Sequence, residues 1–179
     1  LIFFGKKIGN SAHWVALTLI GSSLGIAVSF FVNVFVDTGQ PILETSVPWF
    51  STGSFSVNLG FLINNEAAIM LLVVALISFL VHFYSVGYMK GDPRYSRYFA
   101  YLGIFTFSMN GIVLADNLIM MYIFWELVGL SSYLLIGFWF EKNSAADACK
   151  KAFLTNRVGD IGMFIGIMIL FFSMGTFQI

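Results

Sequence analysis

The stretch that decides the fold is residues 118–140, LIMMYIFWELVGLSSYLLIGFWF. It carries a single charge, Glu126, and a helix that spans a bilayer needs about 20 mostly apolar residues. At about 1.5 Å per residue, Glu126 would lie about 12 Å from the nearer end of such a helix. A carboxylate near the middle of a membrane costs about 2.5–3.5 kcal/mol on insertion scales, so it faces a partner or water. We expect this helix to present Glu126 to a path for protons or other ions.

The composition is that of a polytopic membrane protein. The chain is 59% hydrophobic and 10% charged, whereas soluble domains carry about 25% charged residues. One cysteine, Cys149, leaves no internal disulfide or cysteine-based metal site, and His13 and His82 are too far apart in sequence to form a metal-ligand pair. Dinucleotide, P-loop and nucleophile motifs are absent, as is a basic surface for nucleic acid.

The apolar runs predict an all-α polytopic fold in which residues 1–179 form a single membrane domain. Residues 1–4 look like the tail of a helix, so we expect the chain to be part of a longer protein. Five complete spans are predicted, at residues 14–36, 67–89, 99–115, 118–140 and 158–177.

Three connections carry local signals of their own. Residues 54–59, SFSVNL, alternate polar and apolar side chains within a segment rich in Pro and Gly, which predicts a small β-hairpin. The Asp116-Asn117 turn offers a helix N-cap, with Asp116 expected to be either a solvated helix end or a cap. Ser144 and Asp147 have capping-box spacing, which predicts a helix start at residue 145 and a helix that could continue into the last span.

Basic residues predict the orientation. All nine fall in or beside alternate connections, the first, third and fifth, so the positive-inside rule places these connections in the cytoplasm or matrix and the hairpin outside. They are Lys6, Lys7, Lys90, Arg94, Arg97, Lys142, Lys150, Lys151 and Arg157.

Glu126 is the first candidate for a proton path. Helical spacing places Tyr122, Glu126, Gly129 and Tyr133 on one face, and Gly129 would let a neighbouring helix approach closely. The functional interpretation is a protonatable site in a buried path. The structural alternative is a carboxyl group that is kept protonated by burial or paired with a neighbouring helix.

Two further candidate sites contain ionisable residues. Arg157 and Asp160, three positions apart at the start of the last span, are either a proton entry or a capping ion pair, and Arg157 alone would be a membrane-surface anchor. His82 shares a helical face with Ser78 and Ser85 and is either a proton relay or a hydrogen-bonded packing residue. Trp125 and Trp139 are expected at the membrane interface or in packing.

Five stretches resemble a known family. They are residues 81–89 (VHFYSVGYM), 95–101 (YSRYFAY), 114–118 (LADNL), 125–138 (WELVGLSSYLLIGF) and 151–160 (KAFLTNRVGD). They resemble the antiporter-like chain 5 (or L) of respiratory NADH:quinone oxidoreductase, complex I, over roughly residues 78–176. The large subunit of Mrp-type sodium/proton antiporters and related membrane hydrogenases share the same charged motif.

The resemblance implies a function. It implies a subunit of 14 spans that moves protons, with Glu126, Arg157, Asp160 and His82 in the proton path and a lysine partner for Glu126 in span seven. It also implies that NAD, FMN, iron–sulfur clusters and quinone bind in partner subunits and that this chain binds no cofactor. The expected surroundings are the bilayer and other membrane subunits of complex I, in the bacterial inner (plasma) or mitochondrial inner membrane.

Two other function classes remain open at this stage. One is a cation/proton antiporter of the Mrp type outside any redox complex, and the other is a membrane scaffold without transport. The scaffold predicts that the buried charges can be neutralised without loss of activity.

Overall fold

The computed structural model describes residues 11–37, 43–52 and 55–178, and the predicted helix tail at residues 1–4 lies outside them. The described part is mostly helical, with one small antiparallel sheet. Its long helices are α2 (Ala12–Val32), α3 (Asn65–Tyr88), α4 (Tyr95–Leu114), α5 (Leu118–Ile136) and α6 (Asn143–Met174), and a π-helical turn, η2 (Asn33–Asp37), extends α2.

Most of these helices have the length and composition of membrane spans. Four segments of the described chain qualify, namely α2 with its extension to Phe35, α3, α5 and α6. Their apolar side chains are largely exposed, as expected for helices that face lipid or further protein. The chain is therefore a multi-pass membrane protein. Because α4 is not among the four, the predicted count of five complete spans stays a prediction.

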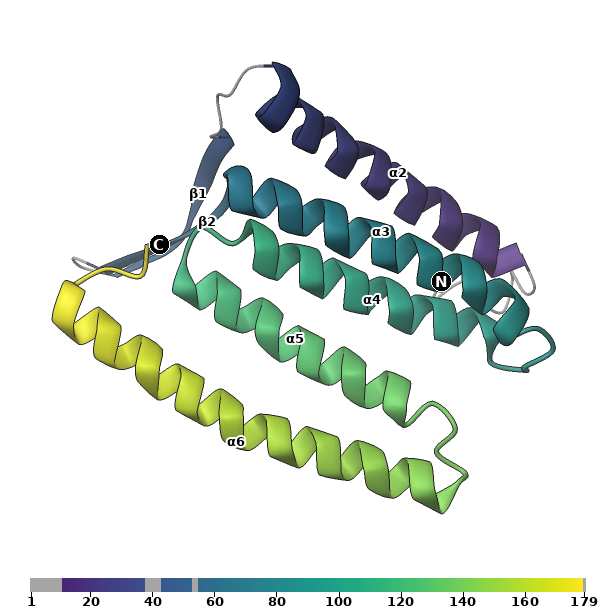
Figure 1. Cartoon of the computed structure of the whole chain (residues 1–179). Coiled ribbons are helices and arrows are strands. Elements are labelled where there is room, and N and C mark those ends of the chain that lie inside the picture. Colours follow the sequence, from purple (N-terminus) through teal and green to yellow (C-terminus); the bar gives the residue numbers. More distant parts are fainter. Residues whose placement is uncertain (1–10, 38–42, 53–54, 179) are drawn as a thin grey trace.

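The helices lie side by side in the order of the chain (Figure 1). The α3–α4 and α5–α6 turns lie at one end of this layer. The hairpin, the α4–α5 turn and the C-terminal end lie at the other (Figure 1). The two described connections that the sequence marks as basic, α3–α4 and α5–α6, thus fall at the end opposite the hairpin.

Small and aromatic side chains form the two described core clusters. Ala12 and Ala16 of α2 pack with Phe99 of α4 and with Phe138, near the turns. Ala27 packs with Leu71 and Ala75 of α3, toward the hairpin end. Alanines allow close approach of helices, which is how helix pairs gain contact where lipid offers no hydrophobic driving force.

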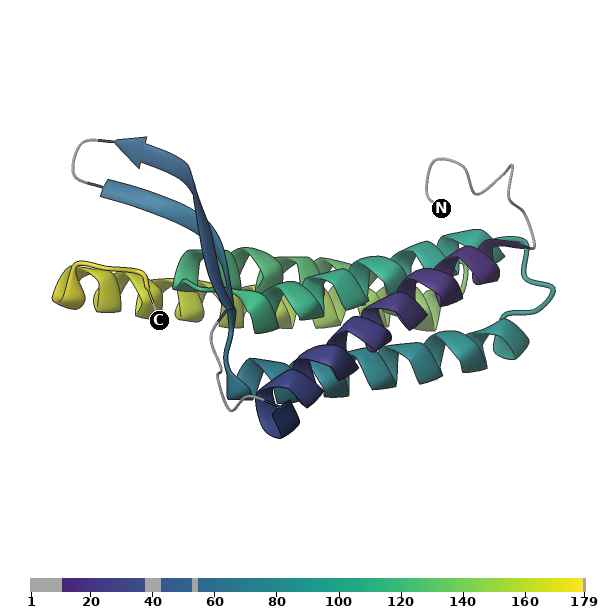
Figure 2. The ribbon, with the colours of Figure 1, turned by 90° about the horizontal axis from the view of Figure 1, so that it is seen from above.

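The predicted hairpin is confirmed. Strand β1 (Leu43–Thr52) pairs antiparallel with β2 (Phe55–Ile63), and an irregularity in the register falls between Pro48 and Phe50. Proline lacks the N–H that a regular ladder needs, so a bulge beside Pro48 is physically reasonable. The hairpin projects from the helix layer (Figure 2).

The α4–α5 turn anchors β2 of the hairpin. Asn117 Nδ2 donates to the Asn58 carbonyl (2.7 Å), while Asn117 Oδ1 accepts from Met120 N (2.8 Å), which confirms the predicted N-cap. A side chain at Gly60 would overlap Asp116, so glycine permits this approach. Asp116 is buried beneath the strand and accepts from Asn117. The expectation of a solvated Asp116 is therefore wrong, because the hairpin covers the turn.

Two predicted helix boundaries are also corrected. Helix α5 ends at Ile136, not at residue 140, because the chain turns at Gly137 and buries Phe138. Helix α6 begins at Asn143 without a side-chain cap, so the Ser144–Asp147 capping box is wrong. The carboxylate of Asp147 instead lies 3.7 Å from Lys150 Nζ. As expected, α6 continues unbroken into the last apolar stretch.

Candidate functional site

Glu126 meets the last helix through the face that the sequence predicts. Along α5, Tyr122 contacts the ring of Phe164 (5.5 Å between centroids) and Tyr133 contacts that of Phe153 (5.4 Å). Between these two ring pairs, Glu126 pairs with an arginine of α6. The α5 face is thus confirmed as the face against α6. Gly129 is not needed for the approach, since an added Cβ would be in ordinary contact, 3.9 Å from Asn156.

The arginine that meets Glu126 is Arg157. Its Nη1 donates to Glu126 Oε2, and its Nε lies 3.8 Å from Asp160 Oδ2 on the next turn of α6. The sequence predicted the Arg157–Asp160 pair but not the contact with Glu126. One guanidinium thus lies between two carboxylates from two helices. We call Glu126, Arg157 and Asp160 the Glu126 cluster.

Asp160 is the most enclosed member of this cluster. Its side chain is 6% exposed, against 22% for Glu126 and 38% for Arg157. Trp125 Nε1 donates to Asp160 Oδ1 (3.1 Å), so the indole holds the carboxylate from the α5 side. The Arg157 guanidinium lies over the Phe153 ring, 4.8 Å from its centroid. The sequence assigned Trp125 to the interface or to packing, and its polar contact was missed.

In the Glu126 cluster, one positive charge lies between two acidic partners. Nε of Arg157 is enclosed but makes no hydrogen bond in the described structure. A small rotation of the guanidinium would bring it closer to Asp160 or to Glu126.

His82 lies apart from this cluster. It is on α3, and α4 lies between α3 and α5 (Figure 1). The predicted face is confirmed, since His82 and Ser85 are both 1% exposed. The Nδ1 atom of His82 lies 2.7 Å from the Ser78 carbonyl oxygen. The structure therefore brings together three of the four predicted site residues and leaves His82 in separate surroundings.

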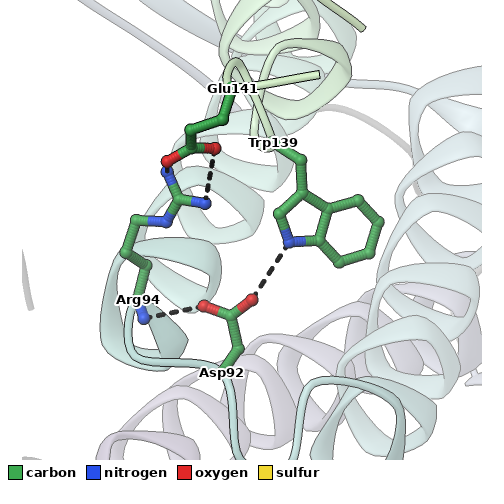
Figure 3. Close-up of polar contacts among 4 residues, drawn as sticks. All are labelled: Asp92, Arg94, Trp139 and Glu141. Carbon is green, nitrogen blue, oxygen red and sulfur yellow. Dashed lines mark hydrogen bonds and ion pairs between the residues drawn. The ribbon is translucent and has the colours of Figure 1, made fainter.

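A second polar network joins the turns at the basic end (Figure 3). Asp92 accepts from Trp139 Nε1 (3.0 Å) and from the Arg94 backbone N (2.7 Å), and Arg94 binds Glu141 through two hydrogen bonds (2.8 and 3.1 Å). We call these four residues the turn network. Its two long-range contacts, Asp92–Trp139 and Arg94–Glu141, each join residues 47 positions apart, and no local pattern could have revealed them.

Both acids of the turn network are held in their ionised forms. Burial raises the pKa of Asp92, but the hydrogen bonds from Trp139 and Arg94 and the nearby Arg94 charge outweigh it, so that pKa lies below its ordinary value. The pKa of Glu141 is likewise lowered, by its own backbone N–H and by Arg94. The Arg94 guanidinium also lies about 5 Å from the rings of Phe138 (5.2 Å) and Phe140 (5.1 Å).

Metal-ligating side chains do not gather in the described part of the chain, where no group of three or more His, Cys, Asp or Glu residues could hold an ion. Cys149 is buried, and its thiol donates to the Ala146 carbonyl (3.2 Å).

Two family models match the chain. Residues 49–99 match the N-terminus of chain 5 of NADH-ubiquinone oxidoreductase (complex I), and residues 115–179 match the transmembrane region of the NADH:quinone oxidoreductase/Mrp antiporter family. Together they cover about two thirds of the chain, including strand β2 of the hairpin, the turn network and the Glu126 cluster.

Relatives agree with these models. The chain is 51% identical to NAD(P)H-quinone oxidoreductase chain 5 of Synechocystis sp. (99% of this chain, 26% of the relative). It is 48% identical to the chloroplastic NAD(P)H-quinone oxidoreductase subunit 5 of Chlorokybus atmophyticus (87% and 24%). The chain thus spans about a quarter of the length of the relatives it matches.

Solved structures share the fold. A chain of the archaeal membrane-bound sulfane sulfur reductase superposes with a TM-score of 0.81 at 22% identity, covering 98% of this chain and 36% of that one. A chain of the Mrp complex from Dietzia sp. gives a TM-score of 0.80 at 21% identity, covering 98% and 18%. At this identity the likeness shows the fold alone.

Proposed function

Because the chain belongs to the family of antiporter-like NADH:quinone oxidoreductase subunits, we propose that it is part of the proton-translocating chain 5 of such a complex. Protons would move through its buried charged residues, coupled to quinone reduction in other subunits. The observation that carries the proposal is the Glu126 cluster, in which residues of two membrane helices share one positive charge. Intramembrane ionisable residues of this kind mark ion and proton pathways.

The mechanism follows from the electrostatics of the Glu126 cluster. While Arg157 is bound to Glu126, that carboxylate is stabilised as an anion. When Arg157 moves toward Asp160, Glu126 loses its cationic partner. Glu126 would then bind a proton, because an unpaired carboxylate is costly in a low-dielectric environment. Moving one charge through 100 mV requires about 2.3 kcal/mol. This energy lies within the range of interaction energies between close charges in a protein. Switching the position of Arg157 would therefore alternate proton uptake and release at Glu126.

The remaining assignments extend this proposal to the whole complex. We assign His82 to the proton path as well, at a second place in the chain. NAD, FMN, iron–sulfur clusters and quinone would bind in partner subunits, and this chain would contact other membrane subunits and lipid. The membrane would be the bacterial inner (plasma) or mitochondrial inner membrane, with the basic turns on the cytoplasmic or matrix side, since their charges follow the positive-inside rule. A chloroplast membrane would fit the chloroplastic relatives.

The second candidate is a cation/proton antiporter subunit of the Mrp type. The family model over residues 115–179 includes Mrp antiporters, and the Mrp complex of Dietzia sp. shares the fold. The same charged cluster could exchange a cation for a proton without any redox module. This candidate predicts transport driven by a sodium gradient and none driven by NADH or NADPH.

Proton transport in membrane vesicles tests the proposal. The full-length subunit in its complex would be compared with Glu126→Gln, which keeps the size of the side chain but removes its charge. Glu66→Gln is the matched control, since Glu66 is exposed in the first turn of α3. We expect NADH or NADPH oxidation to drive acidification in the parent and in Glu66→Gln, and little or none in Glu126→Gln. Unchanged pumping in Glu126→Gln would overturn the assignment of Glu126. Transport driven only by sodium would favour the antiporter.

A further inference from the structure

A cavity of about 590 Å³ lies between α2, α3 and α4. Most of its lining is apolar, including Leu19 and Ile20 of α2, but His82, Thr106 and Asn110 also line it. His82 belongs to α3, and Thr106 and Asn110 belong to α4. The other two lining helices, α2 and α3, lie on the side of α4 away from α5 (Figure 1). The cavity therefore does not belong to the Glu126 cluster.

Two polar atoms on the lining lack hydrogen-bond partners. They are His82 Nε2 and Asn110 Oδ1, and both are buried. The other ring nitrogen of His82 lies 2.7 Å from the Ser78 carbonyl, which can only accept, so Nδ1 carries the hydrogen. In the neutral ring Nε2 is then an acceptor that faces no protein donor. Buried acceptors are nearly always satisfied by protein or ordered water.

A hydroxyl pair lies along the helices between these two atoms. The Thr106 hydroxyl is 3.2 Å from that of Ser78 and joins α4 to α3. His82 is in the second turn from the end of α3, near the basic turns, whereas Asn110 is in the last two turns of α4, near the hairpin. The polar groups therefore form a series along the two antiparallel helices rather than a single cluster.

A second cavity continues the series toward the hairpin. Its volume is about 430 Å³, and it shares Leu19 and Asn110 with the first. Ser22 and Ser23 of α2 add polar side chains to its lining, which also includes Phe61 of β2. Asn110 is thus the residue where the two cavities meet.

We propose that these two cavities hold water and form a second polar path, with His82 as its proton-binding group and Asn110 at its junction. Water occupies a cavity that is roomy and offers polar partners. The lining of the first cavity is mostly apolar, and its polar partners for water are His82, Thr106 and Asn110. A hydronium ion in the cavity would transfer its proton to His82 Nε2 and leave water behind. The imidazolium would then return the proton to another water molecule. The proton-carrying role rests on the proposed function, whereas the presence of water does not.

Thiol labelling tests for water without reference to transport. In membranes that contain the assembled complex with Cys149→Ser, Asn110→Cys would be exposed to a charged, water-soluble thiol reagent. Ser108→Cys is the matched control, because Ser108 is fully buried on the same helix and does not line either cavity. We expect the thiol at position 110 to react at least tenfold faster. Equal rates would mean that lipid or a packed helix fills the cavities, and would overturn the proposal. Thr106→Cys gives a second test if Asn110→Cys does not assemble.

Proton transport then tests the role of His82. The variant His82→Gln keeps hydrogen-bonding capacity but cannot bind a proton, and Asn110→Leu removes the polar junction. We expect each to lower proton transport per electron severalfold, with Ser108→Ala unchanged. Fast labelling at position 110 with normal transport in His82→Gln would overturn the proton path while leaving the function of Glu126 intact. Conversely, normal transport in Glu126→Gln would refute the proposed function of that residue and leave the labelling result standing.

Discussion

Arg157 of α6 donates a hydrogen bond to Glu126 of α5, although 31 positions separate them in the sequence. The same guanidinium lies within ion-pair distance of Asp160, whose own oxygen accepts from Trp125. Two carboxylates, one guanidinium and one indole thus form a connected group across two membrane helices. Each contact can be removed separately, so the contribution of each to transport is measurable.

The charge of Arg157 can be separated from its geometry. Arg157→Gln removes the positive charge that faces Glu126 and Asp160. Arg157→Lys keeps that charge but replaces the planar fork of guanidinium N–H donors with a single ammonium group. A hydrogen bond to a charged group contributes about 1.5–3 kcal/mol, and the partial exposure of Arg157 lowers this to about 1–2 kcal/mol. We expect proton transport in vesicles to fall about tenfold in Arg157→Gln and less in Arg157→Lys. Equal activities for the two variants would contradict a role for the charge.

Trp125 is expected to act through Asp160. Trp125→Phe keeps an aromatic ring but removes the indole N–H that donates to the buried Asp160 carboxylate, a hydrogen bond that contributes about 1–2 kcal/mol. Transport should fall severalfold. Trp14→Phe is the control, because Trp14 is 66% exposed on α2, and it should leave transport unchanged. If both variants behave alike in assembled complexes, the Trp125–Asp160 bond has no part in the function.

Gly111 is expected to be required for α4 to pack on α5. A Cβ at this position would overlap the ring of Phe124, whereas a Cβ at Gly103 of the same helix would meet nothing within 4 Å. Overpacking of this kind costs about 1–3 kcal/mol. Gly111→Ala should therefore lower the thermal stability of the purified complex, while Gly103→Ala should match the parent. A thermal midpoint for Gly111→Ala equal to that of Gly103→Ala would show that α4 and α5 can separate at no cost.

The turn network should weaken only in acid. The pKa values of Asp92 and Glu141 are lowered in the folded protein. Their contribution to stability is therefore complete above the ordinary carboxyl range near pH 4 and is lost as the pH falls below it. The stability difference between the parent and Asp92→Asn should stay constant from about pH 8 to pH 5 and shrink below about pH 4. A difference that disappears between pH 7 and pH 5 would contradict the direction of these pKa shifts.

Much of the local structure could be predicted from the sequence. The apolar runs locate helices α2 to α5 to within a few residues, because a helix in lipid must satisfy its own backbone and cover itself with apolar side chains. Period-two alternation locates the hairpin, and helical spacing identifies the α5 face that meets α6. The Asn117 cap is likewise a local property, since its side chain reaches a backbone N–H three residues on.

The sequence could not identify partners across helices. It places Arg157 beside Asp160, three positions away, but cannot show that α6 turns the same side chain toward Glu126. The sequence also predicts a solvated Asp116, because nothing local indicates that a strand will cover this residue. It predicts too long a helix α5, because the residues after α5 fold back onto the α3–α4 turn through the Trp139–Asp92 hydrogen bond.

For this protein the sequence alone determined that the chain spans a membrane, where its helices and hairpin fall, and which ionisable residues lie in apolar surroundings. These properties depend on composition and on spacing along one helix or strand. Tertiary structure alone decided that Glu126, Arg157 and Asp160 form one cluster, that His82 lies beside a cavity on the other side of α4, and that Asp92 and Glu141 join two turns. Those properties depend on how separate helices rotate and pack against each other, and packing is fixed by contacts between residues far apart in the chain.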